Sequence, residues 1–167
     1  MLTIAFLLSL YVCGLNGLIP YDGIIHRSTD GSSYAFLSSP NIGNHPSFIE
    51  QISPSSTLAV AWFSGGEQQP NCSIAVSLLK LNSQQFTPGV IVSERMNCSN
   101  QNPVPYWDNQ TQQLVHVKES YAQMWHLYSE DRGITWTSPQ IFYSTLGGWD
   151  RNRTIATFDK EGLLFPC

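Results

Sequence analysis

The sequence predicts an all-β protein built from four-stranded blades of a β-propeller. Three observations support this prediction. Short runs of strand-forming residues recur along the chain, and no helical period is present after the first residues. A compact turn motif at residues 129–136 separates two of these runs. The order of the runs repeats after about 50 residues, the length expected of a four-stranded blade.

The turn motif reads Ser-Glu-Asp-Arg-Gly-Ile-Thr-Trp over residues 129–136. Asp131 has a short acceptor side chain that can bind the backbone amides of its own turn. Gly133 supplies the positive φ that a tight hairpin needs. Thr135 restarts the next strand, and the indole of Trp136 can fold under the turn as a hydrophobic plug. The motif therefore predicts a structural hairpin, far from any catalytic site.

The expected strands form two modules of the same order. In the first module they cover residues 47–50, 57–63, 74–79 and 90–92, after a lead-in with one short strand at 34–37. In the second module they cover residues 103–107, 114–117, 124–128 and 141–143. Phe86-Thr87-Pro88 in the first module corresponds to Trp136-Thr137-Ser138-Pro139 in the second. The first module thus carries a degenerate turn motif, with Phe86 in place of the tryptophan.

A third module is expected to begin at residues 153–158 and to stop within a strand at 162–165. A propeller has to close on itself to protect its sheet edges and its central tunnel. Two to three blades cannot close. We therefore interpret residues 18–167 as a partial propeller domain, from the N-terminal part of a longer protein or from a truncated gene model.

The first residues predict a secretory signal peptide. Residues 2–12 form an apolar run that is too short to span a bilayer, which requires about 20 residues. The small residues Gly14 and Gly17 follow this run and offer cleavage points. A buried first strand or an anchor is the alternative. With cleavage of residues 1–17, we expect a secreted or lumenal chain without membrane insertion.

The charge and cysteine content limit the classes of partner. The net charge is −4 with no basic excess, which argues against nucleic-acid binding. The sequence has no Cys-x-x-Cys motif and no Cys/His cluster, so we expect no metal and no cofactor. In an oxidising compartment Cys72 and Cys98 could form a disulfide, which leaves Cys167 without an assigned partner. Four glycosylation sequons begin at Asn71, Asn97, Asn109 and Asn152.

The turn motif and its neighbours resemble the sialidase-like (BNR/Asp-box repeat) family, in its predicted-neuraminidase branch. Landmarks in the order of that branch lie at residues 44–47, 61–67, 102–104 and 147–153, and the resemblance covers about residues 44–160. It implies a six-bladed β-propeller, with about the first two to three blades in this chain and a ligand pocket opposite the Asp-boxes. The structural Asp-box would consist of Ser129, Asp131, Gly133, Thr135 and Trp136.

Two features of true sialidases are missing from this segment. Members that cleave sialic acid hold its carboxylate with three arginines, because a guanidinium group matches a carboxylate in two contacts. Asn44-His45-Pro46 stands where the first arginine is expected, and residues 65–77 lack the acid/base aspartate. The resemblance therefore implies an exo-glycosidase-type domain that acts on or binds an acidic sugar of glycans. A non-catalytic carbohydrate-binding propeller or an inactive fragment is the alternative, and we expect this segment alone to be inactive.

The resemblance implies a different set of pocket residues. Glu67 could act as a general acid if burial raised its pKa, and His45 could assist it. The expected substrate-binding residues are Asn102, Trp149, Arg151, Asn152 and Arg153. Among them, Arg151 and Arg153 could bind a carboxylate or a uronate, and Trp149 could stack on a sugar ring.

Each of these residues also has a structural interpretation. His45 could be a turn residue, Glu67 a solvated loop charge, and the two arginines part of a surface stripe. Asn152 cannot both line a pocket and carry a glycan. The tryptophans Trp62 and Trp125 are expected to belong to the core between blades rather than to a sugar platform.

Overall fold

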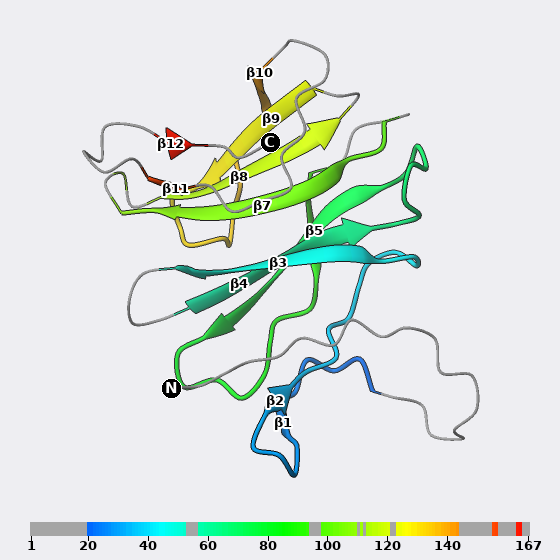
Figure 1. Ribbon diagram of the computed structural model, residues 1–167, viewed down its shortest axis with the longest axis vertical. Helices are drawn as coiled ribbons and strands as arrows, with labels where there is room; N and C mark the ends of the chain where they lie inside the picture. Colours follow the sequence, from blue (N-terminus) through cyan, green and yellow to red (C-terminus); the bar gives the residue numbers. More distant parts are fainter. Residues whose placement is uncertain are drawn as a thin grey trace.

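The computed structural model describes residues 20–52, 57–93, 98–109, 111, 113–120, 123–143, 155–156 and 163–164. In these ranges the chain is all-β, and its strands pair antiparallel in two four-stranded and two two-stranded sheets, none of which is closed. Figure 1 shows the two larger sheets next to each other, with the β1–β2 hairpin on the side of the first sheet that is away from the second. The prediction of an all-β chain is confirmed.

The first sheet has the strand order β3-β4-β5-β6. Its strands are β3 (His45–Ile52), β4 (Thr57–Ser64), β5 (Ser73–Lys80) and β6 (Val90–Ser93). The last six residues of β4 are all buried, which is why this strand reads as a nearly continuous apolar run rather than an alternating one. The first sheet is therefore covered on both faces.

The second sheet repeats this order with β7 (Gln101–Asp108), β8 (Gln113–Ser120), β9 (Gln123–Ser129) and β10 (Gln140–Tyr143). The outer strands β6 and β10 begin at Val90 and Gln140, 50 residues apart. The two expected modules of the sequence thus correspond to two consecutive sheets with the same connectivity.

A shared core joins the two sheets. Strand β7 lies against β3 and β4 of the first sheet. Trp107 of β7 packs among buried aliphatic residues of the first sheet, and Trp136 of the turn motif packs against the same group. The aliphatic members of this core are Ile52, Ala59, Ala61, Val76 and Leu78. Burying a large side chain of this kind stabilises a fold by about 3 kcal/mol, so each sheet depends on the other.

Residues 20–44, which we call the strap, cover the other face of the first sheet. The strap contains the short hairpin of β1 (His26–Arg27) and β2 (Ser33–Tyr34), so the strand expected at 34–37 is shorter and begins one residue earlier. Apolar strap residues pack on Val60, Trp62 and Ala75 of the sheet and on Phe86 of the β5–β6 connection, and Trp62 is only 4% exposed. Trp62 is therefore a core residue, but it packs under the strap and not between the two sheets, where a core between blades was expected.

Two short strands represent the expected third module. Strands β11 (Ile155–Ala156) and β12 (Leu163–Leu164) pair antiparallel within the ranges that the sequence predicts as strands. The described residues contain no helix that is long and apolar enough to cross a membrane. Residues 1–17, the expected signal peptide, lie outside the described residues, as do Asn97 and Cys167.

Candidate functional site

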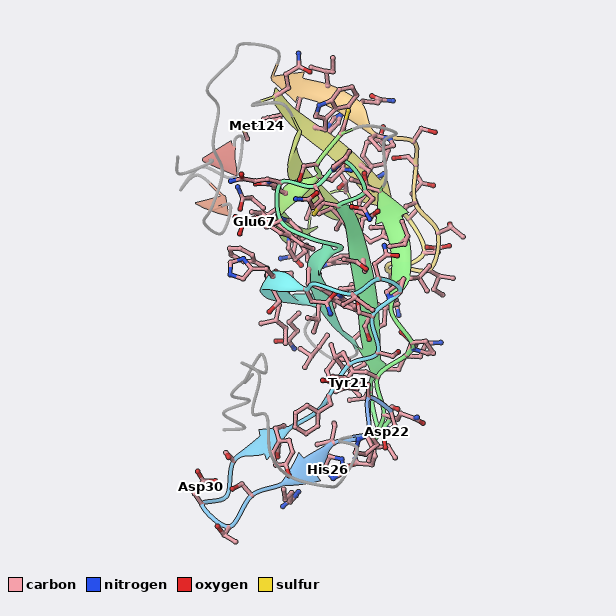
Figure 2. The ribbon with its side chains drawn as sticks, turned by 90° about the vertical axis from the view of Figure 1, so that its right-hand side faces the viewer. Tyr21, Asp22, His26, Asp30, Glu67 and Met124 are labelled. Atoms are coloured by element: carbon pink, nitrogen blue, oxygen red, sulfur yellow. The ribbon has the colours of Figure 1, made fainter. Side chains whose placement is uncertain are left out.

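The two larger sheets share two ends. The turn end carries the turns at residues 81–85 and 130–135, which follow β5 and β9. The entry end carries the first residues of β3 and β7 and the loop at residues 65–72. Figure 2 shows Glu67 of this loop and Met124, near the start of β9, on the same side of the molecule. The turn motif and the candidate site residues therefore occupy opposite ends.

At the turn end, Asp131 organises the turn motif. Its Oδ1 accepts hydrogen bonds from Ser129 Oγ at 2.7 Å and from the amides of Ile134 at 3.1 Å and Thr135 at 2.7 Å. Its Oδ2 accepts the Thr135 hydroxyl at 2.5 Å. Gly133 has a φ of 91°, and its amide donates to Ser129 Oγ at 2.7 Å. The predicted role of Asp131 as an acceptor for its own turn is confirmed.

These hydrogen-bond donors also favour the ionised form of the Asp131 carboxyl group. The Thr135 hydroxyl and amide, which are the strongest of them, lower the pKa of Asp131 to about 2 because they stabilise the carboxylate form. Trp136 Nε1 donates to the Gly133 carbonyl at 3.1 Å, while the ring packs on the core of the first sheet. The indole thus lies under the turn as expected, and the motif is structural in this chain.

The first sheet has a related turn without the aspartate. Asn82 and Arg132, 50 residues apart, have positive φ angles of 64° and 62°. Leu81 stands in the place of Asp131 and is 61% exposed. The Ser83 hydroxyl bonds the backbone of this turn instead. The left-handed residue of the turn is therefore kept without the carboxylate, whereas Ser83, in the place of Gly133, does not share its positive φ.

At the entry end, two glycines bring the candidate catalytic residues together. Gly43, with φ 88°, precedes β3, and Gly66 follows β4. A Cβ atom on Gly43 would lie 3.3 Å from both the Cα and the amide nitrogen of Gly66. A side chain at position 43 would be crowded by the Gly66 backbone, so glycine suits this approach. This contact places the segments of His45 and Glu67 side by side.

His45 and Glu67 form an exposed pair. Nδ1 of His45 lies 3.8 Å from Oε2 of Glu67, and the two side chains are 64% and 51% exposed. The His45 ring also lies near Phe63, with ring centroids 6.3 Å apart. The burial that a general-acid role for Glu67 requires is not found, because its loop turns toward solvent. The pair is instead open to a ligand.

A hydroxyl network around the buried Ser64, which the sequence did not indicate, fixes the strap beside this pair. Ser64, fully buried at the end of β4, has its Oγ 3.1 Å from Ser39 Oγ and accepts the Asn41 amide at 3.0 Å. The Ser39 hydroxyl donates to Asn44 Oδ1 at 2.6 Å and accepts the Trp62 indole N–H at 3.0 Å. The only hint in the sequence is a serine at the end of an apolar strand.

Asn100, just before the first strand of the second sheet, is hydrogen-bonded to the loop at residues 65–72. This side chain is fully buried, and both its backbone and its side-chain amide donate to the Cys72 carbonyl at 2.9 Å. Asn102, a predicted ligand residue, lies two positions further on, in β7, with a φ of 48°. Asn102 therefore lies at the same end of the sheets as His45 and Glu67.

The expected disulfide between Cys72 and Cys98 is not present. Both residues are free cysteines, and both are buried. The Cys72 thiol donates to the Asn100 carbonyl at 3.1 Å, so its sulfur is engaged with the backbone. Burial raises the pKa of the Cys72 thiol, because the thiolate would lose its hydration.

The remaining predicted residues divide by position. Trp149, Arg151, Asn152 and Arg153 lie outside the described residues. The sequon residues Asn71 and Asn109 are exposed, at the entry end and the turn end respectively. Trp125 is half-buried. Within the part of the chain that the structure describes, no group of three or more His, Cys, Asp or Glu side chains could hold a metal ion.

Neither a scan against protein-family models nor a search of curated proteins finds a match for this chain. The functional argument therefore depends on the residues themselves. At the entry end these are an exposed imidazole–carboxylate pair and, at the start of β7, an asparagine, with polar contacts of Ser64 and Asn100 that fix the neighbouring segments. This arrangement offers hydrogen-bond donors and acceptors to a polar ligand.

Proposed function

We propose that this chain is part of a secreted, sialidase-like β-propeller that binds an acidic sugar of glycans at its entry end. The observation that carries the proposal is the His45–Glu67 pair, 3.8 Å apart and on the end opposite the Asp131 motif. In a propeller of this kind the ligand lies at the end opposite the Asp-boxes. The two consecutive four-stranded sheets would be the first blades of six.

The chemistry of the pair suits a sugar. A carboxylate accepts hydrogen bonds from neighbouring hydroxyl groups, and an imidazole can donate or accept one. The contact between His45 and Glu67 is exposed, and even a fully charged pair at the surface contributes only about 0–1 kcal/mol, so a ligand can replace it at little cost. Arg151 and Arg153 would then supply the guanidinium groups that hold the carboxylate of the sugar.

Hydrolysis is the second candidate, and the proximity of the imidazole to the carboxylate favours it. In that case Glu67 would donate a proton to the leaving oxygen of the glycosidic bond, and His45 would orient the carboxyl group. Acids of this kind are usually enclosed in an apolar pocket, whereas Glu67 is half exposed. Binding is therefore the function that the geometry supports best.

A glycan array with the full chain, produced in a secretory host, tests the proposal. We expect retention of glycans with acidic termini and loss of about tenfold in affinity for Glu67→Gln, the effect of weakening one charged hydrogen bond. Glu130→Gln is the matched control, because Glu130 is an exposed carboxylate at the turn end that accepts from Gln113 Nε2 at 3.2 Å. No binding to any glycan, or equal losses for both variants, would reject the proposal.

The same preparation separates binding from hydrolysis. Incubation with fluorogenic glycosides of acidic sugars measures turnover directly. Release of the fluorophore by the wild-type chain, abolished in Glu67→Gln and kept in Glu130→Gln, would establish the second candidate. Retention on the array without release would establish a binding protein.

A further inference from the structure

The turn between β7 and β8 contains the glycosylation sequon that begins at Asn109, and the structure describes its first and third residues. Asn109 is exposed directly after β7, and its Oδ1 accepts the indole N–H of Trp107 at 3.0 Å. The indole nitrogen can only donate, so the oxygen of the carboxamide faces Trp107 and the nitrogen is directed to the other side of the group. Thr111, the third residue of the sequon, is also exposed.

The described neighbours Trp107, Asp108 and Thr111 make defined contacts around this asparagine. Trp107 is 5% exposed and belongs to the core that joins the two sheets. The hairpin is closed by pairing of Asp108 with Gln113, and the Thr111 hydroxyl donates to Asp108 Oδ2 at 2.7 Å. A residue of the core thus fixes one face of the Asn109 side chain, while the residue itself stands at the surface.

We infer that Asn109 carries an N-linked glycan whose attachment point is oriented by Trp107. The inference rests on the secretory route proposed above but not on the acidic-sugar site. The co-reactant is an oligosaccharide linked to a lipid diphosphate, and the modification forms a bond between Asn109 Nδ2 and C1 of the first sugar. The bond from C1 to the phosphate oxygen breaks, the amide nitrogen loses one proton, and the lipid diphosphate leaves. The oxygen of the amide is unchanged and continues to accept from the indole.

The position of Asn109 makes this modification compatible with ligand binding. Strand β7 runs from the entry end, next to Asn100, to the turn end at Asp108. A glycan on Asn109 therefore stands at the end opposite Glu67. Asn71 is the contrasting case, because it lies in the loop of Glu67 and a glycan there would stand beside the candidate ligand site.

Glycopeptide mapping of the full chain from a eukaryotic secretory host tests the inference. Release of glycans with an amidase in heavy-oxygen water converts each modified asparagine into labelled aspartate, and we expect the label at position 109. Asn109→Gln and Thr111→Val should each lack one glycan and migrate faster on a gel than the wild-type chain. Thr111→Ser should keep the glycan and migrate like the wild type. Because Val has the shape of Thr without the hydroxyl, a shift in both variants assigns the loss to the sequon. A secreted wild-type chain with unlabelled position 109, or a chain without any glycan, would overturn the inference.

Hydrogen exchange of the tryptophan indole tests the orientation. The Trp107 N–H should exchange slowly in the glycosylated chain, since its acceptor is unchanged by the modification. Asn109→Ala removes the acceptor and should accelerate this exchange at least severalfold. Rapid exchange in the glycosylated wild-type chain would refute the role of Trp107, and the mapping experiment would still decide the modification itself. Glycan binding on the array reports separately on the proposed function.

Discussion

Thr87 and Thr137 occupy the same place in the two sheets and make the same pair of hydrogen bonds. Thr87 Oγ1 accepts the Leu78 amide at 2.9 Å, and the Thr87 amide donates to the Leu78 carbonyl at 2.9 Å. Thr137 makes both bonds with Tyr128, at 3.1 Å and 2.9 Å. Each threonine thereby connects the chain after the turn to the strand before it. This repeated connection persists although the aspartate of the turn motif is present in only one sheet.

The first prediction concerns this threonine. Thr137→Val should lower the free energy of unfolding by about 1 kcal/mol, because the Tyr128 amide loses its acceptor without any change in side-chain shape. Thr137→Ser keeps the hydroxyl and should be close to wild type. Urea unfolding of the three proteins measures the difference. Equal stability of the valine and serine variants would contradict the role of the hydroxyl.

The second prediction concerns how Asp131 makes the stability of the folded chain depend on pH. Its pKa is about 2 in the folded chain and 3.8 in the reference state, so the folded state favours the carboxylate. The stabilisation is complete above pH 3.8 and is lost as the pH falls toward 2. Asp131→Asn should therefore be less stable than wild type at neutral pH, and the difference should shrink between these two pH values. Thermal unfolding across this range measures it, and a constant difference would exclude Asp131 as the source.

The third prediction concerns the contact between Gly43 and Gly66. Gly43→Ala should destabilise the chain through both its φ of 88° and the 3.3 Å approach of the new Cβ to Gly66. Gly31→Ala is the matched control, since Gly31 has a φ of 84° but no atom within 4 Å of the new Cβ. The control substitution should lower the free energy of unfolding by about 1 kcal/mol, which is the penalty of the left-handed conformation alone. Chemical unfolding should show a larger loss for Gly43→Ala, together with weaker glycan binding. Equal losses would show that the backbone contact is loose.

The fourth prediction concerns the two buried thiols. With its pKa raised by burial, Cys72 holds less thiolate at any given pH than an exposed cysteine, and thiolate is the reactive form. Iodoacetamide at pH 8 should therefore label Cys72 slowly in the folded chain, and Cys98 should also react slowly because it is buried; both should react rapidly in denaturant. Peptide mapping measures both reactions. If the two thiols react in denaturant only after a reductant is added, they form a disulfide, and this result would contradict the free cysteines of this structure.

The parts of the fold that were predictable from sequence are local. All hydrogen bonds of Asp131 lie within four residues of it, so the spacing of Ser129 and Thr135 was enough to predict the turn. The repeat was visible for the same reason, because each sheet is a simple succession of neighbouring strands. The pairing of successive strands also explains why a period of about 50 residues could be read directly.

The parts that were not predictable depend on distant contacts. Ser39 and Ser64 are in contact although they are 25 positions apart in the sequence, and no residue next to either serine indicates this contact. The degree of exposure of Glu67 likewise depends on how the strap meets the loop after β4. Whether Cys72 and Cys98 pair depends on the direction of two side chains, which their spacing does not determine. The sequence could place these residues at one end of the sheets but could not orient them.

The covering of β4 on both faces has a consequence for motion. The amides of its buried residues should be among the slowest to exchange with solvent, because opening them requires removal of the strap and separation of the second sheet. Ser64, to which the strap is bonded, is the last residue of this strand. The exposed pair at the entry end is thus attached to a part of the molecule that should open slowly. A ligand that binds this pair would contact residues that are already ordered, so little conformational entropy would be lost on binding.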